Sequence, residues 1–174
     1  AQLDDSDAAI AAAIVAMPGP ISYERGEVLR LPNLRGWEGH ISAAGLSAEL
    51  GITVLLANDA DLAALGEHRF GAGVGTRDMV YVTASTGVGA GVILGDKLLH
   101  GALSLAEIGH TVIDRSTRGT VETLGSGTAL ARLAGEEGAS IVARANAGDE
   151  GALRHFATVA GDFAIGVFNM VHLF

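Results

Sequence analysis

The stretch that decides the fold is ITVLLANDAD at residues 52–61, where an apolar run ends at an Asn–Asp pair. The run over residues 52–57 predicts a strand that is covered on both faces. Residues 59–70 have helical spacing and are followed by Gly71 and Gly73, so we expect the strand to pass directly into a helix. Asn58 and Asp59 then stand at the carboxyl end of a buried strand, which is where open α/β sheets bind their ligands.

A second informative stretch is TASTGVGAG at residues 83–91, which lies between two apolar segments. We expect strands over residues 79–84 and 88–94, joined by a turn at residues 85–87. The hydroxyl groups of Thr83, Ser85 and Thr86 and the unhindered backbone of Gly87 can wrap anionic oxygens without a lysine. The stretch is not a Walker loop, because it lacks the Gly-Lys-Ser/Thr ending. A glycine-rich hairpin turn with no ligand is the alternative.

The two stretches together indicate phosphoryl transfer. A carboxylate at the end of a strand can accept the proton of a substrate hydroxyl while that oxygen attacks phosphorus. Asp59 is the candidate for this role, and Asn58 would bind the same hydroxyl or orient Asp59. The competing interpretation is an ordinary helix N-cap, for which both Asp and Asn are common.

Acidic residues and a histidine further along the chain can bind sugar hydroxyls. Glu107 and Glu122 can each accept hydrogen bonds, and His110 can donate or accept one. The alternatives are a surface glutamate and a buried core histidine. One histidine without cysteine neighbours does not make a zinc site. Asn33 is a weaker candidate, because asparagine is also a common turn residue.

Composition limits the classes of function. The chain has 174 residues, no cysteine, 25 glycines and a net charge of −9. Disulfides and thiolate metal sites are excluded, and no Lys/Arg cluster exists to neutralise the phosphates of a nucleic acid. We find no apolar run of membrane-spanning length and no signal peptide. We therefore expect a cytoplasmic protein that acts on a small molecule and has no nucleic-acid or membrane partner.

The remaining segments complete an α/β pattern. The last helix carries apolar residues at helical spacing from Leu153 to Phe174. Its apolar tip, together with a chain that starts almost directly in a strand, suggests that both ends of the fold are missing. The other expected elements are strands over residues 8–17, 27–31, 97–100 and 108–113 and helices over residues 41–50, 121–133 and 139–146.

In their order and spacing, these stretches resemble the ROK family (repressors, open reading frames and sugar kinases), including its glucokinases. The resemblance covers nearly the whole chain and includes Met-Pro-Gly-Pro at residues 17–20 and Ser-Gly-Thr-Ala-Leu at residues 126–130. It implies an actin-like ATPase (ribonuclease H-like) fold of two α/β lobes, here residues 1–58 and 59–174. Asp59 matches the catalytic base of the family. The matches to its sugar ligands are Asn33, Asn58, Glu107, His110 and Glu122, and those to its second phosphate loop are Thr83, Ser85, Thr86 and Gly87.

Three departures from the family pattern matter. The Asp-x-Gly-Gly-Thr phosphate motif and the Gly-Gly segment that helps to hold adenosine are both absent. We therefore expect a fragment with an incomplete N-terminal lobe. The Cys-rich zinc loop between the residues that match His110 and Glu122 is reduced to residues 111–121 without cysteine, so zinc is not expected.

The resemblance implies an ATP-dependent hexose kinase that uses Mg²⁺ and forms a homodimer. Two alternatives stay open, namely the sugar-sensing domain of a ROK repressor, which needs no ATP, and a catalytically inactive remnant. The sequence fixes neither the sugar nor the choice between ATP and polyphosphate. All of these interpretations require Asp59 to face a crevice rimmed by Glu107, His110 and Glu122.

Overall fold

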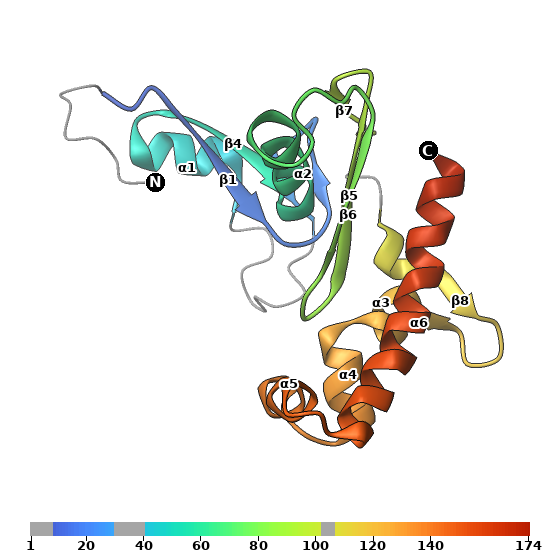
Figure 1. Ribbon diagram of the computed structural model, residues 1–174. Coiled ribbons are helices and arrows are strands. Elements are labelled where there is room, and N and C mark those ends of the chain that lie inside the picture. The colour runs from blue at the N-terminus through green and yellow to red at the C-terminus, as the bar shows by residue number, and fades with distance from the viewer. Residues whose placement is uncertain (1–8, 30–40, 102–106) are drawn as a thin grey trace. The chain divides into compact units, whose positions relative to one another are not determined.

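The computed structural model describes residues 9–29, 41–101 and 107–174 of the chain (Figure 1). Its contacts divide the chain into two compact units. Unit 1 comprises Ala1–Leu62 and His100–Ser104, and unit 2 comprises Ala63–Leu99 and Leu105–Phe174. The lobe boundary between residues 58 and 59 stays a prediction.

Unit 1 contains a parallel pair of strands. β1 (Ala12–Met17) pairs with β4 (Thr53–Asn58), with Met17 opposite Asn58 at the carboxyl ends. The short strands β2 (Ile21–Ser22) and β3 (Glu27–Val28) form an antiparallel hairpin. A small core joins the two pairs and consists of Met17, Ile21, Val28 and Leu56.

The helix predicted over residues 41–50 is confirmed as α1 (Ala43–Leu50). Its first turn is capped by the Ser42 hydroxyl, which accepts from the Gly45 amide at 3.0 Å. It ends at Gly51, whose φ of 69° is left-handed.

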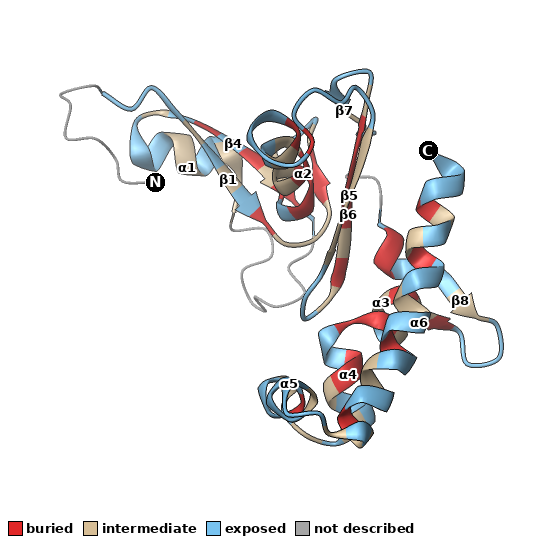
Figure 2. Cartoon of the chain, viewed as in Figure 1, coloured by how far each residue is buried: buried red, intermediate tan, exposed pale blue. Residues whose placement is uncertain are grey.

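The strand predicted over residues 52–57 exists, but it is not covered on both faces. Burial alternates along β4, with Val54 and Leu56 buried and Leu55 54% exposed (Figure 2). Ile14 of β1 is also more than half exposed. An apolar run is compatible with cover on both faces, but within the described residues the core packs on one face only.

α2 (Asp59–Phe70) follows β4 without a loop, as predicted. It begins in unit 1 and continues into unit 2. The backbone amides of Gly71 and Gly73 both donate to the Glu67 carbonyl at 3.0 Å and end the helix. This direct passage from strand to helix fixes the placement of the Asn–Asp pair.

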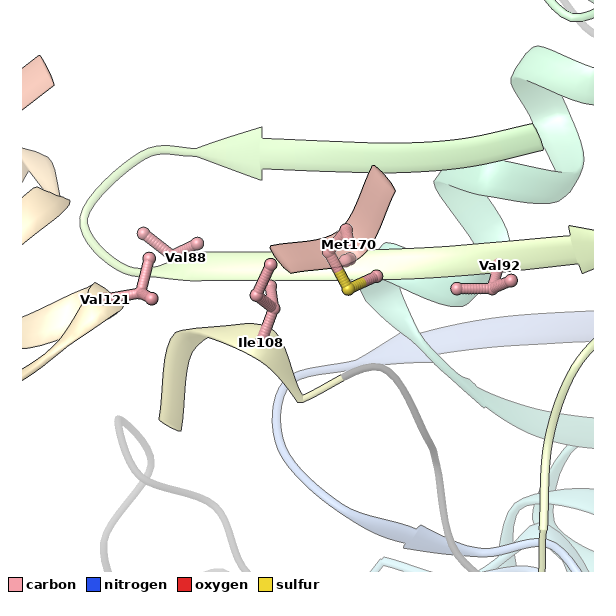
Figure 3. Packing of buried hydrophobic residues seen from close by; sticks show 6 residues of the cluster. Val88, Val92, Ile108, Val121 and Met170 are labelled. Atoms are coloured by element: carbon pink, nitrogen blue, oxygen red, sulfur yellow. The ribbon is translucent and has the colours of Figure 1, made fainter. Parts of the chain in front are cut away.

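After the end of α2, unit 2 continues with an antiparallel meander. The predicted strands and turn are confirmed as β5 (Met79–Ala84) and β6 (Val88–Leu94), followed by β7 (Lys97–Leu98). Gly95 and Asp96, with φ of 58° and 65°, form the turn into β7. The core beside β6 contains Val88, Val92, Ile108, Val121 and Met170 (Figure 3).

The strand predicted over residues 108–113 is correct only for its last two residues. The chain forms a 3₁₀ turn, η1 (Ile108–His110), before the short strands β8 (Val112–Asp114) and β9 (Gly119–Thr120). The amide and the hydroxyl of Thr111 both donate to the Ile108 carbonyl, at 3.0 and 2.7 Å, and these bonds favour the turn.

The single helix predicted over residues 121–133 is two helices, α3 (Val121–Gly125) and α4 (Gly127–Ala134). They break at Ser126, whose hydroxyl caps α4 by accepting from the Ala129 amide at 3.1 Å. The last two helices agree with prediction and are α5 (Gly138–Asn146) and α6 (Glu150–Leu173).

α6 packs closely on α3. A Cβ at Gly166 would lie 2.7 Å from Val121 Cγ1, so a larger residue at this contact would force Val121 or α6 to shift. α6 is also the one described helix that is long and apolar enough to cross a membrane by length and composition. The core helix of a soluble protein passes the same test when it is mostly buried, and 17% of the apolar window of α6 is buried here.

Candidate functional site

Asn58 caps α2 and is buried. Its Oδ1 accepts from the amides of Ala60 and Asp61 at 3.0 and 3.2 Å, and its Nδ2 donates to the Gly19 carbonyl at 3.2 Å. The N-cap interpretation is therefore correct for Asn58. Nδ2 carries two hydrogens, and among the described residues Gly19 binds one of them, so a donor remains for a ligand.

Asp59 differs from its neighbours because its side chain is exposed. Its Oδ1 accepts from the Ala60 amide at 2.9 Å, which leaves further lone pairs of the carboxylate for another donor. The positive end of the α2 dipole favours a negative charge at this position. An accessible carboxylate at a strand end has the chemistry of a general base.

Asp61, two residues later, is 1% exposed. Its Oδ2 accepts from the Tyr23 hydroxyl at 2.6 Å. Burial raises the pKa of Asp61, and the hydrogen bond from Tyr23 acts in the opposite direction. Burial and the Asp61 carboxyl together raise the pKa of Tyr23 above its ordinary value. Sequence reasoning missed this pair, because nothing in the sequence distinguishes Asp61 from Asp59 or connects it to Tyr23.

The turn between β5 and β6 is held from outside by the start of α4. The Gly127 amide donates to the Ser85 carbonyl at 2.7 Å, and the Thr128 hydroxyl donates to the Thr86 carbonyl at 2.6 Å. Within the turn, the Ser85 amide donates to the Gly87 carbonyl at 2.8 Å. The side chains of Ser85 and Thr86 are exposed, whereas Thr83 is half-buried. The turn therefore exposes the hydroxyls of Ser85 and Thr86 to solvent, while hydrogen bonds hold its backbone.

Glu122 belongs to the same neighbourhood. Its Oε2 accepts from the amide of the buried residue Val88 at 2.9 Å, directly after the turn. Glu122 therefore ties α3 to the start of β6, and its second carboxylate oxygen can accept from another donor. A side chain at Gly87 would collide with this carboxylate, so the space beside it depends on glycine.

Glu107 and His110 lie at the two ends of η1. Glu107 Oε2 and His110 Nε2 are 3.9 Å apart. The His110 side chain is 71% exposed, which excludes the core-histidine interpretation. Ile108 packs in the same core as Val121 and Val88, so η1, α3 and β6 meet there (Figure 3).

The predicted site residues thus fall into two groups. Asn58 and Asp59 are in unit 1, and the residues of the β5–β6 turn, Glu122 and η1 are in unit 2. Asn33 lies outside the described residues. Over residues 9–29, 41–101 and 107–174, no three histidine or acidic side chains cluster closely enough to hold a metal ion.

Comparisons with known proteins agree on one family. The sequence model of the ROK family matches residues 1–174. A glucokinase of Halalkalibacterium halodurans is 38% identical over 128 residues, which are 68% of this chain and 38% of that protein. A xylose repressor of Caldicellulosiruptor bescii is 37% identical over 101 residues, which are 58% of this chain and 25% of that protein.

A solved structure extends the match to nearly the whole chain. The ROK family glucokinase of Streptomyces griseus, in complex with glucose and AMPPNP, superimposes with a TM-score of 0.84 and 29% identity. The match covers 97% of this chain and 64% of that chain. It shows the α/β, actin-like ATPase fold that the resemblance implied. The chain spans less than two thirds of each of these relatives.

Proposed function

The chain belongs to the ROK family, and on that premise we propose that it is part of an ATP-dependent hexose kinase of the glucokinase type. The observation that carries the proposal is the contrast within the Asn-Asp-Ala-Asp stretch. Asp59 is exposed at the end of β4, whereas Asp61 is buried, so Asp59 is the acid that a substrate hydroxyl can reach.

Asp59 acts as the general base in this proposal. It accepts the proton of a hexose hydroxyl as that oxygen attacks the terminal phosphorus and ADP leaves. The remaining donor of Asn58 orients the same hydroxyl. Glu107, His110, Glu122 and Asn33 bind other hydroxyls of the sugar.

The turn between β5 and β6 fits a nucleotide phosphate. Its exposed hydroxyls, its fixed backbone and the side-chain-free position at Gly87 are the features of a phosphate loop. Thr83, Ser85, Thr86 and Gly87 would hold the phosphates of ATP. ATP would supply the phosphoryl group as its Mg²⁺ complex, in which phosphates and waters provide most metal ligands.

A second candidate function is the sugar-sensing part of a ROK repressor. The 37% identity to a xylose repressor over 101 residues favours it. A sensor would bind a sugar through the same hydroxyl ligands and would need neither ATP nor a general base.

Asp59→Asn tests the proposed function. We expect this variant to bind glucose in calorimetric titration as the wild type does, and to lose phosphoryl transfer from ATP. Glu137→Gln is the matched control, because Glu137 is exposed and makes no capping hydrogen bond at α5. Equal turnover in Asp59→Asn and Glu137→Gln would refute the role of Asp59.

Titration of the wild type with glucose and with an ATP analogue separates the candidate functions. Binding of both favours the kinase, binding of sugar alone favours the sensor, and binding of neither favours an inactive remnant. The homodimer, the cytoplasmic location and the lack of nucleic-acid and membrane partners stay predictions. Sedimentation velocity of the chain tests the first of them.

A further inference from the structure

We infer that Tyr23 and Asp61 form a positioning pair that holds the Asn58–Asp59 turn in the geometry needed for proton transfer. The inference rests on the proposed function, because it assigns both residues to the same reaction. Neither residue is among those proposed to touch the hexose or the phosphates.

The pair connects two elements across the turn. Tyr23 lies in the turn between β2 and β3, and Asp61 lies in the first turn of α2. The Tyr23 hydroxyl donates to Asp61 Oδ2 at 2.6 Å and accepts from the Asn58 amide at 3.3 Å. One hydroxyl therefore holds the residue before Asp59 and the residue two positions after it.

Asp59 has few other restraints. Its neighbours Asn58 and Ala60 are buried, and the Asn58 side chain binds the amides of Ala60 and Asp61. The direction in which the exposed Asp59 carboxylate leaves the backbone follows from how firmly these neighbours are held. Proton transfer is sensitive to displacements of the order of 1 Å, so a looser turn would slow it.

Asp61 is costly to the fold. Its side chain is 1% exposed, and its Oδ1 has no hydrogen-bond partner in the part of the chain that the structure describes. A buried acceptor without a partner destabilises a protein, and a buried carboxylate does so more than an amide. An asparagine would keep an oxygen for Tyr23 without the charge. Buried polar groups that are costly to the fold and lack a partner are found at functional sites.

His100 contacts the tyrosine of the pair. Its ring centroid is 5.0 Å from that of Tyr23, with the planes tilted by 45°. The electrostatic effect of His100 lowers the pKa of Asp61, and that of the nearby Asp59 raises it, but burial is the largest cause and raises it. Asp59 and His100 thus act on the ionisation of Asp61 in opposite directions.

The test compares Tyr23→Phe and Asp61→Asn with Tyr81→Phe in the full chain. Tyr81 is the other tyrosine of the chain and has no part in the proposed site. We expect Tyr23→Phe and Asp61→Asn to lower kcat for hexose phosphorylation on the order of 10- to 100-fold. We expect KM to change less than about threefold, because no substrate contact is removed.

Stability separates positioning from a merely structural role. Asp61→Asn removes a buried charge, so urea unfolding at neutral pH should show it to be at least as stable as the wild type. A variant that is slower and no less stable cannot be explained by loss of the fold. Turnover of Tyr23→Phe and Asp61→Asn equal to that of Tyr81→Phe would overturn the inference while leaving the Asp59→Asn result intact.

Hydrogen exchange decides the case in which the wild type transfers no phosphoryl group. That outcome would refute the proposed function, but the Tyr23–Asp61 pair would still have to hold the Asn58–Asp59 turn. We expect the Asn58 amide to exchange on the order of tenfold faster in Tyr23→Phe than in Tyr81→Phe. Equal exchange rates in these two variants would overturn the inference.

Discussion

Gly127→Ala should displace the turn that is proposed to bind phosphate. A Cβ at position 127 would lie 2.6 Å from the Ser85 carbonyl oxygen, and ordinary van der Waals contact begins at 3.4 Å. The same oxygen accepts from the Gly127 amide at 2.7 Å. It therefore cannot move away from the new methyl group without weakening that hydrogen bond.

The size of the effect follows from three contributions. Overpacking a tight contact costs about 1–3 kcal/mol, and the weakened hydrogen bond costs about 1 kcal/mol. The better helix propensity of alanine offsets up to about 1 kcal/mol. We expect a net loss of about 1–3 kcal/mol in the free energy of unfolding. For a chain of this size, each kcal/mol lowers Tm by about 2–4 °C.

Gly138→Ala is the matched control. Gly138 is the first residue of α5 as Gly127 is of α4, and nothing lies within 4 Å of its added Cβ. We expect this variant to gain up to about 1 kcal/mol. Urea unfolding and titration with an ATP analogue measure both variants, and only Gly127→Ala should bind the analogue more weakly. Equal stability changes and equal binding would refute the contact between α4 and the turn.

Three further predictions concern acidic residues. Glu122→Ala leaves the amide of the buried residue Val88 without its acceptor and should cost about 1–3 kcal/mol in urea unfolding. Glu122→Gln keeps an oxygen there and should lose less, so equal losses would contradict the hydrogen bond. Because the pKa of Asp61 is raised in the folded state, folding favours its protonated form; the stability of the wild type relative to Asp61→Asn should fall as pH rises above about 4. A difference independent of pH would show that Asp61 is not buried as described. Hydrogen bonds from neighbouring hydroxyls lower the pKa of Asp114 to about 2, so its contribution is full above about pH 4 and lost as pH falls to 2. In Asp114→Asn, Tm should therefore fall less between about pH 4 and pH 2 than it does in the wild type. An equal fall of Tm in both proteins would contradict the hydrogen bonds to Asp114.

The order of elements could be predicted because periodicity and turn residues agree along most of the chain. The strand–helix junction at Asn58 and the β5–β6 hairpin follow directly from the apolar runs and the residues that end them. The strand and helix predictions that were incorrect fall where a local side-chain hydrogen bond outweighs the spacing of the apolar residues. Thr111 turns an apolar segment into η1, and Ser126 caps a new helix in the middle of an amphipathic one.

The candidate site was predictable only in part. Asn58 and Asp59 stand out because of their position at a strand end. Their different burial depends on the cap geometry, which the sequence does not show. The bond between Tyr23 and Asp61 joins residues 38 positions apart, and no local pattern indicates it. Glu122 is recognisable as an acid, but its bond to Val88 depends on how α3 meets β6.

The close contact between Gly166 of α6 and Val121 of α3 has a consequence for substitutions at position 166. Val121 occupies the space above Gly166, and it directly precedes Glu122 in the sequence. A Cβ added at position 166 would lie 2.7 Å from Val121 Cγ1, so Val121 or α6 would have to shift, whereas Ile108 Cδ1 at 3.5 Å is in ordinary contact. A substitution at Gly166 therefore acts on the position of Glu122, which accepts from the Val88 amide, without changing that side chain.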